Sequence, residues 1–76
     1  MQKFDININT EFIKLDQLLK FSAIAESGSD AKDMILSEMV SVNDELCTMR
    51  GKKIRPGDKV IIEFEDETVL IDVGSE

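Results

Sequence analysis

The chain has 76 residues, with nine Lys and Arg residues against sixteen Asp and Glu residues, so its net charge at pH 7 is −7. A chain this short forms one small domain, expected to span residues 1–76, and its 42% hydrophobic content argues against disorder. The sequence has no His and one Cys, which excludes His-dependent catalytic triads, most catalytic zinc sites and an internal disulfide. No apolar run reaches membrane-spanning length and no signal-peptide pattern is present, so we expect a cytoplasmic protein. We also expect no cofactor.

The first part of the chain predicts a strand followed by a helix. Apolar residues alternate with polar ones near the start, which indicates a short half-buried strand. Further along, apolar residues recur at helical spacing and predict a first helix from about residue 14 or 15 to residue 22. The residues that carry these patterns are Phe4, Ile6 and Ile8 for the strand, and Leu15, Leu18, Leu19 and Ser22 for the helix.

A second short helix should follow a break at residues 26–29. Ser27 with Asp30 three residues later resembles a capping box, and Ser29 is an alternative N-cap. Helices of two or three turns do not persist alone, so both must pack on a sheet. The apolar face that the second helix would use consists of Ala31, Met34, Ile35 and Met39.

The rest of the chain predicts four strands. Val40 and Val42 begin the first of them, Asn43-Asp44 suits a tight turn, and Leu46 follows in the next strand. Residues 48–59 are predicted to form a loop, and residues 60–64 and 69–73 the last two strands, with a turn near residues 66–67. This order predicts an α+β domain in which two short helices pack on one side of a small, mostly antiparallel sheet.

Two groups of side chains that could carry chemistry have simpler structural interpretations. Cys47 has no His to activate it, so we expect it to be a small apolar residue on or beside the second strand. Four carboxylates gather near the last turn, but they lack the ligand spacing of a calcium loop and are typical of a solvated hairpin. They are Glu63, Glu65, Asp66 and Glu67. The sequence therefore predicts neither a catalytic residue nor a metal site.

Positive charge is concentrated in one segment. Residues 50–59 carry five Lys and Arg residues and one Asp, whereas residues 60–76 carry six acidic residues and no basic one. Screening confines each charge's field to about 8–10 Å. The segment can therefore hold phosphates at contact range, although the acidic chain as a whole repels nucleic acid at a distance. Taken alone, the segment is equally consistent with an ordinary polar connection.

Several motifs, in this order, resemble one known family. They are Lys14-Leu15-Asp16 with Leu18-Leu19, Ser27-x-Ser29-Asp30-Ala31-Lys32 with Ile35, Val40-x-Val42-Asn43, and the run from Arg50 to Val60. Together they resemble the RNA-binding domain first seen in ribosomal protein S-four, also called the alpha-L motif, and more closely its small stand-alone bacterial members. The resemblance covers about residues 4–73, with a motif core at about residues 12–65. It implies a non-catalytic domain whose helices and loop bind structured RNA, such as ribosomal RNA.

The resemblance also implies which residues bind RNA. The basic positions of the family fall on cations of this chain, and we expect these to form one continuous face, away from the carboxylates of residues 63–67. They are Lys14, Lys32, Arg50, Lys52 and Lys53, and we add Lys20 and Arg55 as further RNA-binding candidates. The partners implied are RNA, with the ribosome or an RNA-processing protein as further partners, and neither a membrane nor a small-molecule substrate.

The chain departs from the family pattern at four places. Gly28 replaces a common Arg, and Glu38-Met39 stand where a Gly is usual. Asp44 replaces the Gly of the Val-Asn-Gly turn, and Met49 replaces the first Arg of the basic loop. Two lost cations and one added carboxylate predict weaker binding of phosphates.

Two other classes of function are alternatives. The first is a protein–protein interaction module that keeps this fold with weakened RNA binding, which the acidic net charge favours. The second is a ubiquitin-like sulfur carrier, because the strand and turn motifs at residues 42–45 and 56–62 also resemble the late strands of such carriers. The carrier chemistry needs a terminal Gly-Gly, whereas this sequence ends Val73-Gly74-Ser75-Glu76.

Overall fold

A computed structural model describes all 76 residues. It contains two helices and seven strands, two of which were not predicted. In chain order the elements are β1 (Gln2–Ile8), β2 (Ile13–Lys14), α1 (Leu15–Phe21), α2 (Gly28–Leu36), β3 (Val40–Val42), β4 (Glu45–Leu46), β5 (Lys53–Ile54), β6 (Lys59–Glu63) and β7 (Thr68–Ser75). Neither helix is long and apolar enough to cross a membrane.

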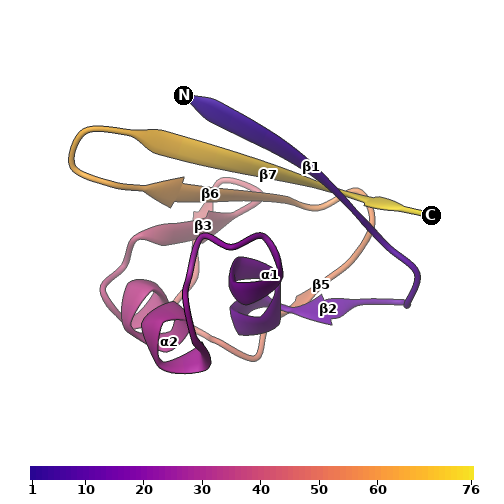
Figure 1. Cartoon of the computed structure of the whole chain (residues 1–76), viewed down its shortest axis with the longest axis horizontal. Coiled ribbons are helices and arrows are strands. Elements are labelled where there is room, and N and C mark those ends of the chain that lie inside the picture. Colours follow the sequence, from indigo (N-terminus) through magenta and orange to yellow (C-terminus); the bar gives the residue numbers. More distant parts are fainter.

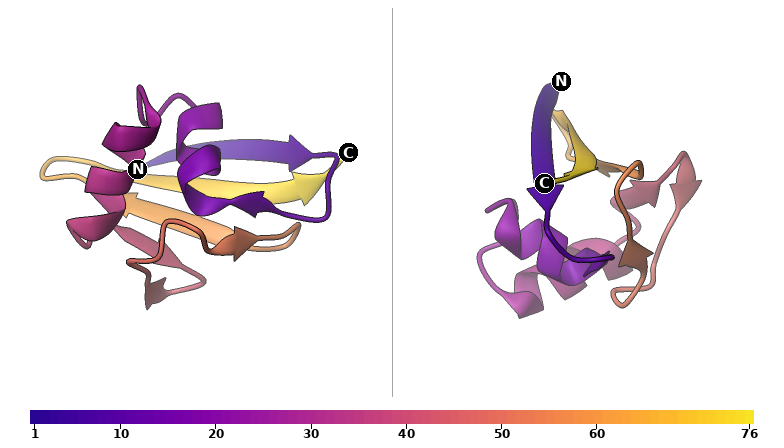
Figure 2. Two further views of the ribbon diagram at one scale, coloured as in Figure 1. Left: turned by 90° about the horizontal axis from the view of Figure 1, so that it is seen from below. Right: turned by 90° about the vertical axis from the view of Figure 1, so that its right-hand side faces the viewer.

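Five of the strands form one sheet, in the order β1-β7-β6-β3-β4. The pair β1–β7 is parallel and the other pairs are antiparallel. Both helices lie on one side of this sheet, and a separate two-stranded sheet, β2–β5, lies beside α1 (Figures 1 and 2). The predicted α+β class, with two short helices on a mostly antiparallel sheet, is confirmed.

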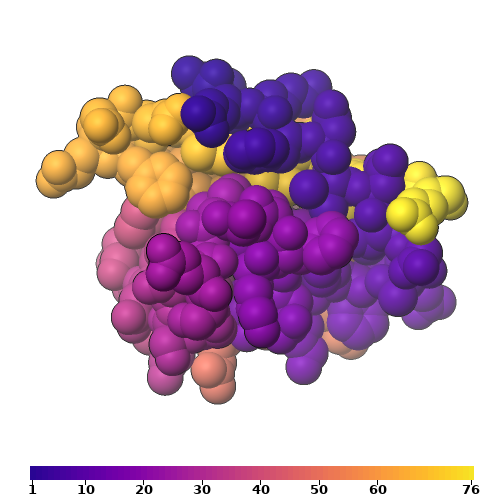
Figure 3. All heavy atoms as spheres, viewed as in Figure 1, coloured from indigo at the N-terminus to yellow at the C-terminus, as the bar shows by residue number.

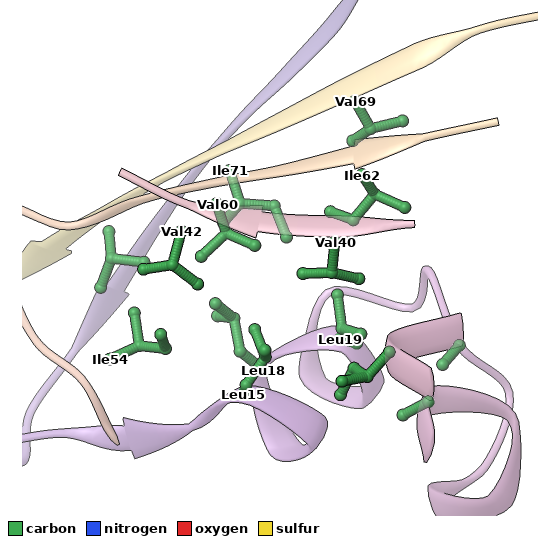
Figure 4. Close-up of a cluster of buried hydrophobic side chains, with 14 of the residues drawn as sticks. Leu15, Leu18, Leu19, Val40, Val42, Ile54, Val60, Ile62, Val69 and Ile71 are labelled. Atoms are coloured by element: carbon green, nitrogen blue, oxygen red, sulfur yellow. The ribbon is translucent and has the colours of Figure 1, made fainter. Parts of the chain in front are cut away.

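The core lies between the helices and the sheet. Its fifteen buried residues are all apolar, and no polar or charged residue is buried. Alternate residues of β6 and β7 point toward the helices, as a half-buried strand requires. Figure 4 shows Leu15, Leu18 and Leu19 of α1 directed toward the sheet valines and isoleucines above them. The spacing of these leucines therefore builds the helix–sheet contact that the sequence predicted.

The start of α2 resolves the two candidate caps. The side-chain oxygen of Ser27 accepts a hydrogen bond from the backbone N–H of Asp30 at 3.2 Å, and the Asp30 carboxylate accepts one from the N–H of Glu26 at 3.3 Å. This reciprocal arrangement satisfies two backbone donors at the helix start. Ser27 is therefore the N-cap, while Ser29 lies inside the helix.

The segment predicted as a loop at residues 48–59 contains a short strand. Lys53 and Ile54 form β5, which pairs in antiparallel fashion with β2, so that Ile13 faces Ile54 and Lys14 faces Lys53. A two-residue strand shows no alternation, so no periodicity could reveal it. The prediction of a continuous loop was wrong because Ile54, fully buried, draws the chain into the core.

The tight turns adopt left-handed backbone conformations. Asn43 and Asp44, between β3 and β4, have φ values of 51° and 70°, as a two-residue hairpin turn requires. Glu38, which with Met39 stands where the family pattern has Gly, has φ 62°. Gly57 has φ 98°, a conformation that is costly for residues with a Cβ.

Replacing Gly57 should therefore destabilise the fold through the backbone alone. No atom lies within 4 Å of a Cβ placed there, so Gly57→Ala should cost about 1–2 kcal/mol by conformational strain without a steric clash. Gly28→Ala is the matched control, because Gly28 opens α2 and also has free space around it; it should leave stability unchanged or raise it by less than about 1 kcal/mol. Urea unfolding of the two variants measures both values. Equal stability of the two variants would contradict the assignment.

Candidate nucleic-acid interface

The basic segment is held in place by one apolar side chain. Ile54 is fully buried beneath the sheet, and its neighbour Lys53 is exposed. Alternation across the short strand thus puts the isoleucine in the core and the lysine in solvent. In Figure 4, Ile54 lies beside the leucines of α1.

The start of α1 also holds the segment. No side chain caps this helix. Instead, the backbone N–H of Leu15 donates to the carbonyl of Lys52 at 2.9 Å, and that of Asp16 donates to the carbonyl of Arg50 at 3.1 Å. Free N–H groups at a helix start need such acceptors. The backbone carbonyls of the loop satisfy two of them, which leaves the side chains of Arg50 and Lys52 free to face water.

Pairing of β2 with β5 places two cations side by side. Lys14 and Lys53 are direct cross-strand partners, and both are exposed. Like charges that face each other across a strand pair repel, so an anion bound between them would relieve this repulsion. The Lys53 ammonium also lies 5.0 Å from the centroid of the Phe12 ring, within the range of a cation–π contact. Phe12 was missed from the sequence because no helical or strand pattern includes it.

A hydrogen-bonded group closes the other end of the segment. The Asp58 carboxylate accepts from the Arg55 N–H at 2.8 Å and from the Asn43 side-chain amide at 3.0 Å. The Asn43 side-chain oxygen accepts from the Lys59 N–H at 2.9 Å. This group, which we call the Asn43–Asp58 clamp, joins the β3–β4 turn to the turn before β6. The clamp fixes the backbone position of Arg55, from which its side chain extends.

Between these anchors lies an open depression of about 540 Å³. Three of the predicted RNA-binding residues line it, namely Lys52, Lys53 and Arg55. Met49 and the two residues of the clamp also line it. A shallow, cation-lined hollow suits a polyanion that lies along the surface better than a small molecule, which needs an enclosed and mostly apolar pocket.

All seven predicted RNA-binding residues are exposed, and none forms a salt bridge. The salt bridges of the structure belong to Lys3, whose Nζ lies 3.9 Å from carboxylate oxygens of both Asp5 and Asp72. In a chain with sixteen acidic residues, this separation leaves the charge of the basic segment available to an external anion.

The structure joins five of the seven predicted residues through backbone contacts and a shared hollow. Lys14, Arg50, Lys52, Lys53 and Arg55 belong to one connected unit built from β2, β5 and the start of α1. We call these five residues the basic surface. Two further candidates, one on each helix, have no hydrogen bond or strand pairing to it: Lys20 in the last turn of α1 and Lys32 on α2.

The acidic turn between β6 and β7 lies far from this unit. Figure 1 shows that turn at the opposite end of the molecule from the β2–β5 pair. In Figure 3 the helices form the front of the molecule, and part of the basic segment protrudes at the lower rim. Cys47 takes no part: it packs partly buried against the core, and its N–H donates to the Val40 carbonyl at 2.9 Å.

The clamp should make stability depend on acid pH. The pKa of Asp58 is lowered below its ordinary value of 3.8, chiefly by the hydrogen bond from the Arg55 N–H. Desolvation partly offsets this effect, whereas the hydrogen bond from Asn43 and the charges of Lys52 and Arg55 add to it. A lowered pKa means that stabilisation is present above pH 3.8 and is lost as pH falls through the lower pKa of the folded state. Asp58→Asn, which keeps the shape without the charge, should be less stable than the parent at about pH 6 and closer to it at about pH 3. Urea unfolding across this pH range measures the difference in unfolding free energy between the parent and the variant. A difference that does not change with pH would contradict the lowered pKa of Asp58.

Comparison with known proteins identifies the family. A family model described as the S4 domain matches residues 6–72. The chain is also 45% identical over 58 residues to a protein of Bacillus subtilis (strain 168) named "Probable ribosome maturation protein RlbA", an alignment that covers 76% of this chain and 82% of the relative. The resemblance seen in the ordered motifs is thus confirmed over nearly the whole length. The chain belongs to the S4 domain family.

Proposed function

We propose that this chain is a non-catalytic module that binds structured RNA, with ribosomal RNA as the first candidate, through the basic surface. One observation carries the proposal. Five exposed cations that form no salt bridge lie on a backbone that is anchored at both ends, in a member of the S4 domain family. Lys20 and Lys32 would extend the contact along the helices. The unit that binds is taken as residues 1–76, with its motif core at about residues 12–65.

The anchoring favours binding because little of the surface has to be ordered. A loop that becomes fixed only on binding loses conformational entropy, which weakens the complex. Here Ile54, the α1 start and the Asn43–Asp58 clamp already hold the loop backbone. A phosphate between Lys14 and Lys53 would also remove their mutual repulsion. Phosphate contacts position a protein on RNA without reading the sequence of bases, so shape would decide which RNA is bound.

The relative's name supports a ribosomal setting. The relative is named a probable ribosome maturation protein. We infer that this chain acts in the same setting, in the cytoplasm, where it binds ribosomal RNA directly or alongside an RNA-processing protein. No residue of the chain is proposed to carry out chemistry on that RNA.

The net charge of −7 favours a second candidate, a protein–protein interaction module with the same fold. Met49, exposed beside the basic segment where the family usually has Arg, also reduces phosphate contacts and adds an apolar side chain. Nothing in the comparisons supports the sulfur-carrier alternative. RNA binding and protein binding are separated by the two measurements below.

RNA binding through the basic surface should be strongly salt-dependent. If four to six cations contact phosphates of an RNA duplex, log K should fall with log salt concentration with a slope of about −4 to −5. Fluorescence anisotropy with labelled ribosomal RNA hairpins over a salt series measures this slope. A slope near zero with measurable binding would show that phosphate contacts do not hold the complex.

Loss of three loop cations should abolish most binding without unfolding the chain. In the triple variant Arg50→Ala, Lys52→Ala, Lys53→Ala, each exposed substitution should change stability by no more than about 0.5 kcal/mol. The slope of log K against log salt should become less negative by about 3, because three phosphate contacts are removed. The affinity for RNA should drop about tenfold or more.

A charge-compensated control separates local contacts from overall charge. The triple variant lowers the net charge by three, and adding Glu63→Gln, Glu65→Gln and Glu67→Gln at the distant β6–β7 turn restores −7. The compensated variant should bind as poorly as the triple variant. Recovery of parental affinity would mean that overall charge governs binding, and full affinity of the folded triple variant would show that the basic loop is not the RNA site. Absence of RNA binding by the folded parent would favour the protein-interaction module.

A further inference from the structure

One edge of the five-stranded sheet is long and uncovered. β1 is the outermost strand, seven residues long, while the strand at the opposite edge, β4, has two residues. Apart from its ladder with β7, the backbone of β1 makes one hydrogen bond, from the Glu76 N–H to the Ile8 carbonyl at 3.0 Å. Figure 1 and the right panel of Figure 2 show β1 at the rim of the molecule. Its outer row of N–H and C=O groups is thus free to pair with another strand.

The side chains of β1 are also suited to a partner. Phe4 lies on the same face of the sheet as Ile6 and Ile8, yet it is 37% exposed. Lys3 and Asp5, its neighbours in the strand, lie on the other face. An exposed aromatic residue at a free sheet edge gains from a cross-strand neighbour. A strand that pairs with β1 must place favourable neighbours opposite a cation, an aromatic residue and an anion in succession, namely Lys3, Phe4 and Asp5.

A second copy of β1 satisfies this restriction in one register. Two antiparallel copies of a strand in a continuous sheet are related by a two-fold axis perpendicular to the sheet, so residues on the same face meet each other. When Phe4 faces Phe4 of the partner subunit, Lys3 faces Asp5 of the partner subunit, and the symmetry forms this pair twice.

The neighbouring registers are worse. A shift in one direction places Lys3 opposite Lys3 of the partner subunit, and a shift in the other places Asp5 opposite Asp5 of the partner subunit. Like charges directly opposite each other destabilise a strand pair, whereas opposite charges and aromatic pairs stabilise it. A further shift pairs Asp5 with Asn7 of the partner subunit and loses both charge pairs.

We propose that β1 pairs with β1 of a second copy of this chain, centred on Phe4, to form a weak symmetric dimer with a continuous ten-stranded sheet. One strand pair buries less than the roughly 1,200 Å² of a standard interface, so association is expected at high protein concentration. β1 and the β2–β5 pair lie at different parts of the molecule (Figure 1), so this interface leaves the basic surface accessible and does not depend on RNA binding.

Charge reversal at Asp5 tests this register. Asp5→Lys removes the exposed Lys3–Asp5 salt bridge but replaces the like-charge Asp5–Asp72 pair by an opposite-charge pair. Because exposed salt bridges contribute little, the fold should be retained. The change also reduces the net charge from −7 to −5, which by itself would favour association. In the dimer, however, it places two lysines opposite each other at both symmetric positions. The dimer dissociation constant should therefore rise about tenfold.

The swapped variant Lys3→Asp, Asp5→Lys is the matched control. It has the parental composition and net charge, and it restores both pairs between subunits with reversed signs. Sedimentation equilibrium over a concentration series up to the millimolar range should show that the parent and the swapped variant associate. The Asp5→Lys variant should associate much more weakly. Circular dichroism verifies that each variant is folded. A parent that is monomeric throughout, an Asp5→Lys variant that associates as the parent does, or a folded swapped variant that stays monomeric would each overturn the proposal.

Discussion

The arrangement of the candidate site depends on burial of Ile54. Charged residues surround this isoleucine in the sequence, yet its side chain is fully buried beneath the sheet. Burial of one such side chain contributes about 1.5–3 kcal/mol, enough to hold a short strand that has little intrinsic stability. The pairing of β5 with β2 and the hydrogen bonds to the start of α1 follow from that position. The cations on either side must then face solvent, so the same contact that closes the core also presents the basic surface.

Charge separation follows from how the chain distributes its polar residues around this core. The acidic residues of the β6–β7 turn lie at the far end of the molecule, and Lys3 is neutralised at the sheet edge by Asp5 and Asp72. The basic surface has no such partners within salt-bridge distance. Because salt screens fields beyond about 8–10 Å, an acidic protein can carry a local surface that attracts phosphates. The proposed RNA binding would then depend on local contacts more than on the net charge.

Much of the fold could be predicted from the sequence because its helices and longer strands carry clear patterns. The spacing of Leu15, Leu18 and Leu19 located α1, and Ser27 with Asp30 located the start of α2. What the sequence did not reveal depends on contacts between distant residues. The parallel pairing of β1 with β7 joins the two ends of the chain, and β2–β5 joins two-residue segments 40 positions apart. Glu38, one of the two residues that stand where the family pattern has Gly, adopts a left-handed conformation that favours Gly. For the site, Lys14 was expected near the loop and lies there, while Phe12 and the Asn43–Asp58 clamp became visible only in three dimensions.

The most direct test of the account is to map the RNA contact residue by residue. Amide chemical shifts of the isotope-labelled protein would be followed by NMR as a ribosomal RNA hairpin is added. The account predicts that the largest shifts occur at residues 14–16 and 50–58, with little change at residues 63–67. Shifts concentrated at the β6–β7 turn or on the outer face of the sheet would contradict it, as would unchanged spectra at a large excess of RNA over protein.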